Sequence, residues 1–387
     1  MRNIALQTLL LVGVFWLIFS FSFSITCNST ITNSTTLTGD LNCNGSQGII
    51  INGTNVVLDC AGYKLYNYTA YGLYIKGVNV TVKNCNISGE VPILVDTIYT
   101  DNHSNTIKII NNTILSDFDG IKTYSGTVTV EIIGNTMKGN QDYYSTSIWL
   151  NGDYLNATIK ENNISNYWEG VYIPLSNGII SVENNNITTY GYAISSSGDY
   201  NHFTIINNRI NCTGSNQWAV GLWSDNITVS LENNTIFSES HGIKIITENS
   251  RLDLKNNNVT GYRDAIEISS DGSVINTIDN AVNCITCRTD EDAVYIYGND
   301  NSINVERDQV NSTASDATKN EAKEQPQHKE QPKENQTAKP VSNVTEEKPN
   351  ETNVPPITGR ATGVSDIINR IKEIIISIIE WIKSLFG

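Results

Sequence analysis

Few side chains in this 387-residue chain are of the types that do acid–base chemistry or bind metal ions. The chain contains 4 His, 7 Cys and 2 Met, too few for a histidine-rich zinc site or a methionine-rich copper site. We therefore predict neither a metal nor a cofactor.

The most suggestive acid–base pair is His241 with Asp264, which the chain's repeat predicts to be neighbours, with Arg263 beside them. A histidine next to a carboxylate can transfer protons, but it can equally form a surface hydrogen bond. No catalytic residue is assigned, and His241 and Asp264 are kept as ligand-binding candidates.

Aromatic residues form a second candidate site. Apolar Ile148, Val171, Leu222 and Val294 are expected to point inward, so the next residue along each strand should point outward. These outward residues are Trp149, Tyr172, Trp223 and Tyr295. Exposed rings on a rigid face can pack against sugar rings, with nearby acids and amides bonding the hydroxyls. Alternatively, aromatics are simply favoured in strands or are covered by loops and glycans. Lys244 and Glu267, one repeat apart, are expected to form a surface ion pair.

The elements that position these residues come from an internal repeat. Phrases such as IINNTILS, VENNNITT and LKNNNVTG recur with an apolar anchor at steps of 23 to 27 residues. The anchors are Ile87, Ile114, Met137, Ile164, Ile187, Ile210, Ile236, Val259 and Val282. A second phrase keeps step with the first, as in GLYI, GVYI, GLWS and AVYI. We therefore expect two strands and two turns about every 24 residues.

This period and the alternation within each phrase predict an all-β fold, a single-chain right-handed parallel β-helix of about 11 to 12 rungs over residues 25–310. The chain has 51 Asn, many of them doubled within the phrases. Asn tolerates a left-handed backbone at tight corners, and stacked Asn amides can bond from rung to rung. Longer steps predict insertions near residues 98–106, 139–145, 213–218 and 285–292.

The opening CNGSQGIIINGTNVVLDCAGYKL and the following YGLYIKGVNVTVKNCNISG resemble the parallel β-helix repeats of pectin-lyase-like and NosD-type surface proteins. The resemblance covers residues 26–310 and implies the fold, not one activity. Such families include polysaccharide lyases and hydrolases, carbohydrate-binding modules, adhesins and envelope proteins. The copper binding often ascribed to NosD-type proteins is not carried over, because His and Met are scarce.

The amino-terminal segment and the Asn-x-Ser/Thr sites indicate export. Residues 1–24 read as a secretory signal peptide, with an uncleaved membrane anchor as the rival interpretation. The chain has 20 Asn-x-Ser/Thr sites, some expected by chance in an Asn- and Thr-rich protein. The glycosylation candidates singled out are Asn52, Asn79, Asn111, Asn163, Asn233, Asn258, Asn335, Asn343 and Asn350. We expect an extracellular, cell-surface or membrane-associated glycoprotein.

Cysteine spacing is compatible with export. Cys27 with Cys43 and Cys60 with Cys85 are candidates for disulfides between neighbouring layers. Cys284 and Cys287 form either a vicinal-type disulfide or two buried thiols, since one C-x-x-C pair is too little for zinc. Cys212 is left as the unassigned thiol.

After the repeat the composition changes. Residues 311–362 are rich in Lys, Glu, Pro, Asn, Gln and Thr and are predicted to be a disordered, glycosylated linker. Residues 363–387 show an apolar stripe at helical spacing and predict an amphipathic helix. Its charges disfavour a spanning helix, which leaves an in-plane membrane anchor or a self-associating or partner-binding helix.

The net charge of -15 disfavours nucleic acid as a partner. The favoured function is a non-catalytic cell-envelope protein, structural or adhesive, with surface glycans or envelope proteins as partners. The alternative is a polysaccharide lyase or glycoside hydrolase with carboxylates on one face of the β-helix.

Overall fold

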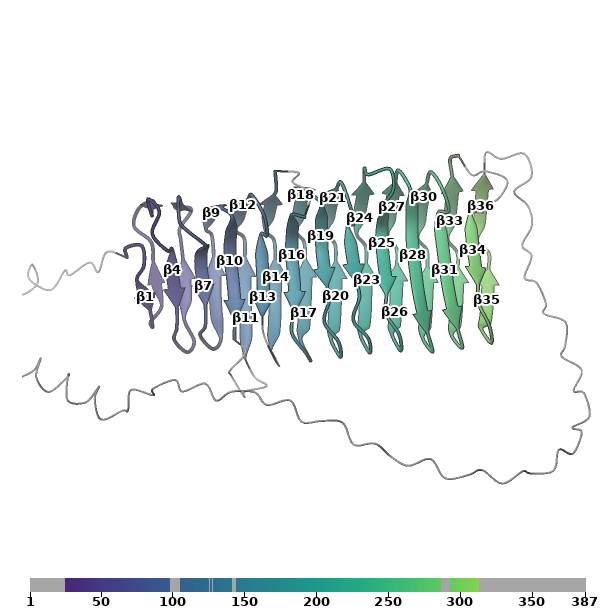
Figure 1. The fold of residues 1–387 in the computed structure, drawn as a ribbon, viewed down its shortest axis with the longest axis horizontal. Helices are drawn as coiled ribbons and strands as arrows, with labels where there is room; N and C mark the ends of the chain where they lie inside the picture. Colours follow the sequence, from purple (N-terminus) through teal and green to yellow (C-terminus); the bar gives the residue numbers. More distant parts are fainter. Residues whose placement is uncertain are drawn as a thin grey trace, which may run out of the picture. The chain divides into compact units, whose positions relative to one another are not determined.

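A computed structural model describes residues 25–97, 105–124, 126, 128–140, 144–286 and 293–312. These residues form an all-β, right-handed parallel β-helix, as the sequence predicts (Figure 1). Three parallel sheets of 12 strands each run the length of the solenoid. Each strand pairs with the strand three before it and the strand three after it in the sequence. The number of rungs agrees with the expected 11 to 12.

The three sheets are called A, B and C, in the order in which the chain enters them. Sheet A contains β1 (Thr30–Ile31), β4 (Ile49–Ile51), β7 (Tyr71–Ile75), β10 (Val91–Asp96), β13 (Ile121–Tyr124), β16 (Thr146–Asn151), β19 (Glu169–Ile173), β22 (Ile194–Ser196), β25 (Trp218–Trp223), β28 (His241–Glu248), β31 (Ile266–Asp271) and β34 (Val294–Tyr297). Sheet B contains β2 (Thr35–Thr36), β5 (Val57–Asp59), β8 (Val80–Lys83), β11 (Thr106–Ile110), β14 (Thr129–Ile133), β17 (Asn156–Lys160), β20 (Ile179–Glu183), β23 (His202–Ile206), β26 (Thr228–Glu232), β29 (Arg251–Lys255), β32 (Val274–Ile278) and β35 (Ser302–Glu306). Sheet C contains β3 (Leu41–Asn42), β6 (Lys64–Tyr66), β9 (Asn86–Gly89), β12 (Thr113–Ser116), β15 (Thr136–Lys138), β18 (Asn163–Tyr167), β21 (Asn186–Thr189), β24 (Arg209–Cys212), β27 (Thr235–Ser238), β30 (Asn258–Gly261), β33 (Ala281–Cys284) and β36 (Gln309–Ser312).

Each rung therefore has three strands, and the expectation of two strands per repeat is wrong. The Asn-rich phrase is not one strand but two short ones, for example β20 and β21, separated by a corner at Asn184 and Asn185. Asn184 adopts a left-handed backbone, with φ of 54°, which turns the chain sharply between the two sheets.

The Asn that follows each left-handed corner residue builds a ladder inside the solenoid. Asn185 is buried, and its Oδ1 accepts from the backbone N–H of Asn162 at 2.9 Å and from the Asn162 side chain at 3.0 Å. Its own Nδ2 donates to the Ile159 carbonyl at 2.8 Å and to Asn208 Oδ1 at 3.0 Å. The same arrangement links Asn112, Asn135, Asn162, Asn185, Asn208, Asn234, Asn257 and Asn280. The predicted Asn ladder is therefore present at the corner between sheets B and C.

The repeat anchors form one inward-facing stack of equivalent side chains along sheet C, and such a stack is called a file. Ile114 is in register with Ile87 on one side and Met137 on the other, and the pairing continues to Val282. All of these anchors are buried in one continuous hydrophobic core. This file holds the rungs in a fixed register, so side chains on the outer faces also repeat in files.

The cysteine predictions have different outcomes. Disulfides join Cys27 to Cys43 and Cys60 to Cys85, with Cα atoms 5.3 Å and 4.6 Å apart, as proposed from the sequence. Cys284 is disulfide-bonded, and Cys287 lies outside the described residues. Cys212 is a buried free thiol, in agreement with its unassigned status.

The predictions for residues 1–24, the linker and the terminal helix over 363–387 lie outside the described residues and stay predictions. The last described strand, β36, ends at Ser312, just past the predicted boundary at residue 310. Within the part of the chain that the structure describes, no helix has the length and hydropathy needed to cross a membrane.

Candidate functional site: the outer face of sheet A

The outer face of sheet A gathers the aromatic and charged side chains that the sequence singles out. In register, its central file reads Tyr74, Leu94, Lys122, Trp149, Tyr172, Ser195, Gly221, Lys244, Glu267 and Tyr295. Successive strands in a sheet lie about 4.8 Å apart, so neighbours in this file are within contact distance. The face is rigid because each of its strands is paired on both sides except at the ends.

Trp149 and Tyr172 are direct neighbours in this file, as predicted. Their ring centroids are 5.7 Å apart. The Lys122 ammonium lies 3.6 Å from the centroid of the Trp149 ring and 2.9 Å from Asp119 Oδ2. Lys122 thus covers one side of the indole while its charge is balanced by a largely buried carboxylate.

Trp223 does not belong to this file, so that part of the predicted column is wrong. β25 begins at Trp218, and Gly221 is the residue in register with Ser195 and Lys244. Trp223 lies two positions further along the strand, opposite Ile246. The side chain still points outward, because a shift of two residues keeps the same face of a strand. The cause is the insertion between Cys212 and Trp218, which moves the start of the strand relative to the repeat.

The shift creates an aromatic cluster that the sequence did not reveal. Trp218 and Trp223 pack with ring centroids 4.4 Å apart, and Tyr192 contacts both, at 5.9 Å and 5.5 Å. A Cβ on Gly221 would lie 3.0 Å from Trp218 and 3.1 Å from Trp223, so glycine lets the two indoles close over the strand. We call the outward side chains of Trp149, Tyr172, Tyr192, Trp218 and Trp223 the aromatic face.

His241 and Asp264 meet at the far end of this face. His241 Nε2 lies 3.5 Å from Asp264 Oδ2, so the predicted neighbour relationship is confirmed. The same nitrogen lies 3.6 Å from Glu267 Oε2, and Lys244 Nζ is 2.8 Å from that oxygen. The Lys244–Glu267 pair is thus present, but its side chains are only 17% and 10% exposed, so it is more buried than a typical surface pair. The Lys244 ammonium also lies 4.5 Å over the Trp218 ring.

Glu169 brings a partly buried carboxyl group to the same face. It is in register with Thr146 and receives hydrogen bonds from Thr146 Oγ1 at 3.4 Å and Ser195 Oγ at 3.3 Å. Burial raises the pKa of the Glu169 carboxyl above its usual value, and the nearby Asp119 charge adds to this, while the two hydroxyl groups act in the opposite direction. Glu169 therefore holds a proton more readily than an exposed glutamate.

The remaining predicted ligand residue, Tyr295, is 45% exposed and sits in the last strand of sheet A, in contact with Tyr297 at a centroid distance of 4.9 Å. It lies in the central file, beyond Glu267. The aromatic face and the His241 cluster are thus contiguous, whereas Tyr295 lies at the end of the solenoid. Tyr192 and Trp218 were not among the predicted ligand residues, although each lies two residues before an inward anchor, Ile194 and Val220, at the position that His241 holds before Ile243.

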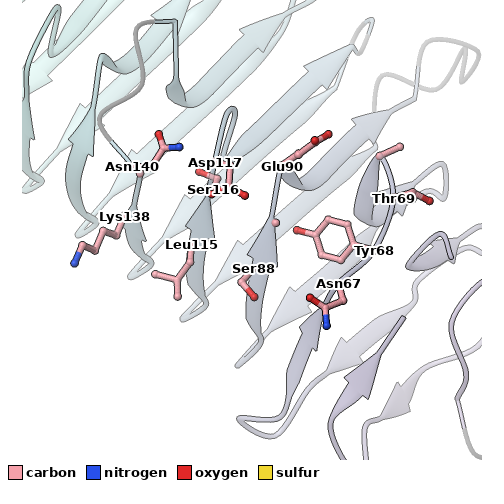
Figure 2. Close-up of a pocket in the computed structure, with 13 residues that line it drawn as sticks. Asn67, Tyr68, Thr69, Ser88, Glu90, Leu115, Ser116, Asp117, Lys138 and Asn140 are labelled. Carbon is pink, nitrogen blue, oxygen red and sulfur yellow. The ribbon is translucent and has the colours of Figure 1, made fainter. Parts of the chain in front are cut away.

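A separate hollow of about 670 Å³ opens at the corner between sheets C and A, near the start of the solenoid (Figure 2). Glu90, Asp117 and Lys138 contribute charged groups to its lining, and Leu115 and Tyr68 contribute apolar surface. The Tyr68 hydroxyl is buried and has no hydrogen-bond partner among the described residues, and this burial raises the pKa of Tyr68. Nothing in the sequence pointed to this hollow, because its lining comes from irregular corners.

The comparisons with known proteins concern the fold. No protein-family model matches the chain, and no curated protein sequence matches it. Among solved structures, the chain is similar to a tailspike protein of the E. coli bacteriophage HK620 in complex with a pentasaccharide, with 9% identity and a TM-score of 0.43 over 74% of this chain and 69% of that one. It is also similar to the Dettilon tailspike protein, with 13% identity and a TM-score of 0.35 over 71% of this chain and 60% of that one. Neither likeness carries a functional assignment for this chain.

Proposed function

We propose that this protein is a secreted, glycosylated component of a cell envelope, non-catalytic and structural or adhesive, that binds glycans through the aromatic face of sheet A. The observation that carries the proposal is the grouping of five aromatic side chains on, or directly before, four successive strands of one rigid sheet, β16, β19, β22 and β25. Aromatic rings pack against the apolar faces of sugars, and a preformed array avoids the entropy of ordering loops on binding.

The charged groups beside the rings suit polyhydroxylated ligands. The Lys122–Asp119 and Lys244–Glu267 pairs flank Trp149 and Trp218 and offer both donors and acceptors to hydroxyl groups. A sugar that stacks on the covered side of Trp149 displaces Lys122 from the ring. The ammonium then remains close enough to Asp119 to bond a sugar hydroxyl.

Two observations support a location outside the cytoplasm. The disulfides Cys27–Cys43 and Cys60–Cys85 require an oxidising compartment in most organisms. Of the described glycosylation candidates, Asn79 is half-buried, and the others are exposed: Asn52, Asn111, Asn163, Asn233 and Asn258. Glycans attached there would leave the outer face of sheet A accessible, because these residues lie in or beside sheets B and C or at corners. Membrane attachment through residues 363–387 belongs to the same proposal.

A glycan array combined with a product-release assay on the retained polysaccharides tests the function. The proposal predicts retention of one or more glycans without the appearance of new reducing ends or unsaturated products. No retention on any glycan would contradict it, and retention with turnover would favour an enzyme.

One observation favours the enzyme as the second candidate. The hollow of Figure 2 brings Glu90 and Asp117 together on adjacent corners, and paired carboxylates are the usual machinery of glycoside hydrolysis. If the protein is a hydrolase, Glu90→Gln and Asp117→Asn should each abolish product release, whereas Trp223→Ala should weaken binding only. Unchanged turnover in both carboxylate variants would exclude the hollow as the active site.

A further inference from the structure

We propose that His241, Asp264 and Glu267 form a binding site for one divalent transition metal ion of the zinc class. The three side chains come from β28, the loop before β31, and β31, on the outer face of sheet A. One ligand atom from each lies within 4.8 Å of the others. The cluster adjoins the aromatic face and shares Glu267 with the Lys244–Glu267 pair, but the proposal does not rest on glycan binding.

The distances within the cluster fit metal ligands better than hydrogen bonds. His241 Nε2 is 3.5 Å from Asp264 Oδ2 and 3.6 Å from Glu267 Oε2. A good N–H···O bond spans about 2.7–3.2 Å, so neither contact is one. Around a tetrahedral zinc ion, with bonds of about 2.0–2.2 Å, neighbouring ligand atoms are about 3.3–3.6 Å apart. Two of the three distances in the cluster therefore match those of such a site, and the third, between the carboxylate atoms of Asp264 and Glu267, is within 4.8 Å.

The orientation of the ligands is set by groups behind them. His241 Nδ1 is 3.0 Å from the Oγ of Ser240, a fully buried residue, which directs Nε2 toward the two carboxylates. Tyr297 donates to the other oxygen of Glu267, Oε1, at 3.4 Å. Such contacts to the non-ligating atoms of metal ligands fix their rotamers and the histidine tautomer.

The set of donor atoms indicates the class of ion. One imidazole nitrogen and two carboxylate oxygens suit zinc and its neighbours in the first transition row, whereas calcium takes six to eight oxygen ligands. The His241, Asp264 and Glu267 side chains are 13%, 14% and 10% exposed, so the cluster is mostly buried but still contacts solvent, and water would supply the fourth ligand.

Lys244 is the resident cation that a metal ion must displace. Its ammonium lies 2.8 Å from Glu267 Oε2, the oxygen nearest to His241. It also lies 4.5 Å over the Trp218 ring, which offers the displaced ammonium a favourable position. Metal binding and the Lys244–Glu267 pair are therefore alternatives at the same carboxylate.

Calorimetric titration of the full-length, metal-free protein with zinc chloride tests the site. We expect one tight site in the wild type, weakened by about tenfold or more in His241→Ala and in Glu267→Gln. His202→Ala is the matched control, since His202 is an exposed histidine on sheet B, and it should bind as the wild type does. Lys244→Met should bind zinc several-fold more tightly. Cobalt chloride should give the intense visible absorption of a four-coordinate Co²⁺ centre in the wild type and not in His241→Ala.

The outcomes separate this site from adventitious binding. Equal zinc affinity in His241→Ala and the wild type, with far-ultraviolet circular dichroism confirming that both are folded, would mean an adventitious ion only and would overturn the proposal. Absence of zinc binding by the wild type, or a Lys244→Met variant that binds no more tightly, would overturn it as well. Glycan binding by the metal-free protein should be retained, so failure of the metal site leaves the glycan proposal standing.

Discussion

Trp218 and Trp223 pack against each other across Gly221, with their ring centroids 4.4 Å apart. The two indoles come from the first and last residues of β25, and the missing side chain at Gly221 between them lets the rings meet. A single glycine thus turns two separate aromatic residues into one apolar patch.

Gly221→Val should therefore open this patch. The new Cβ would lie 3.0 Å from Trp218 and 3.1 Å from Trp223, closer than ordinary contacts, so the rings must separate. We expect the near-ultraviolet circular dichroism of the coupled indoles to diminish and glycan affinity to fall several-fold. Gly39→Ala is the control, because nothing lies within 4 Å of its added Cβ. A Gly221→Val protein with unchanged spectrum and affinity would contradict the role of this pair.

The Asn ladder should be a major source of stability. Asn185→Ala removes one acceptor and one donor from a buried row and leaves the Asn162 N–H and the Ile159 carbonyl unsatisfied. Each of these two buried unsatisfied groups costs about 1–3 kcal/mol, so a loss of about 2–6 kcal/mol is expected in denaturant unfolding. Asn186→Ala, at the neighbouring exposed position, should cost less than about 0.5 kcal/mol in protein made without glycans. Similar losses of unfolding free energy in the two variants would contradict a major contribution of the ladder to stability.

The raised pKa of Glu169 predicts that replacing this residue by glutamine changes the stability of the protein in a pH-dependent way. The folded protein raises the pKa of this carboxyl, so its contribution to stability is fully present below the pKa of the unfolded chain and is lost as pH rises through the folded pKa. Glu169→Gln is neutral at every pH and escapes this loss. The variant should match the wild type at about pH 4 and exceed it in thermal stability at about pH 7. A variant that is less stable than the wild type at neutral pH would count against a raised pKa.

Cys212 should be chemically inert in the folded protein. Burial raises the pKa of its thiol to about 11, and Sγ donates to the Gly191 carbonyl at 2.6 Å. Because the thiolate is the reactive form, iodoacetamide at about pH 8 should leave Cys212 unmodified until denaturant is added. Rapid modification of the native protein, read by mass spectrometry, would contradict this environment.

The sequence predicted the solenoid because its apolar anchors repeat. Ile87 and Ile114 pair in register as expected, since a buried file tolerates little change of residue or spacing. The number of strands per rung was not predictable from alternation alone, because β20 and β21 are too short to be told apart without the Asn184 corner. The repeated pattern therefore identified the stacked anchors but not the residue at which each strand begins.

The candidate site was predicted less completely, for the same reason. His241 and Asp264 were placed together because both lie in unshifted repeats. Trp223 was misplaced because an insertion precedes its strand. Glu267 was not linked to His241 because the two residues occupy different register positions on sheet A, so no repeat relates them. Insertions and contacts between files leave no periodic signal in a sequence.

The most direct test of the glycan-binding face compares two double variants. Calorimetric titration with the glycan best retained on the array should show that Trp149→Ala with Trp223→Ala loses about tenfold or more in affinity, because hot spots in binding sites are mainly large aromatic residues. Tyr154→Ala with Tyr200→Ala, which removes rings that are 60% and 61% exposed at corners between sheets A and B, should bind like the wild type. Equal affinity of the two double variants, or a loss confined to the corner tyrosines, would contradict binding at the aromatic face.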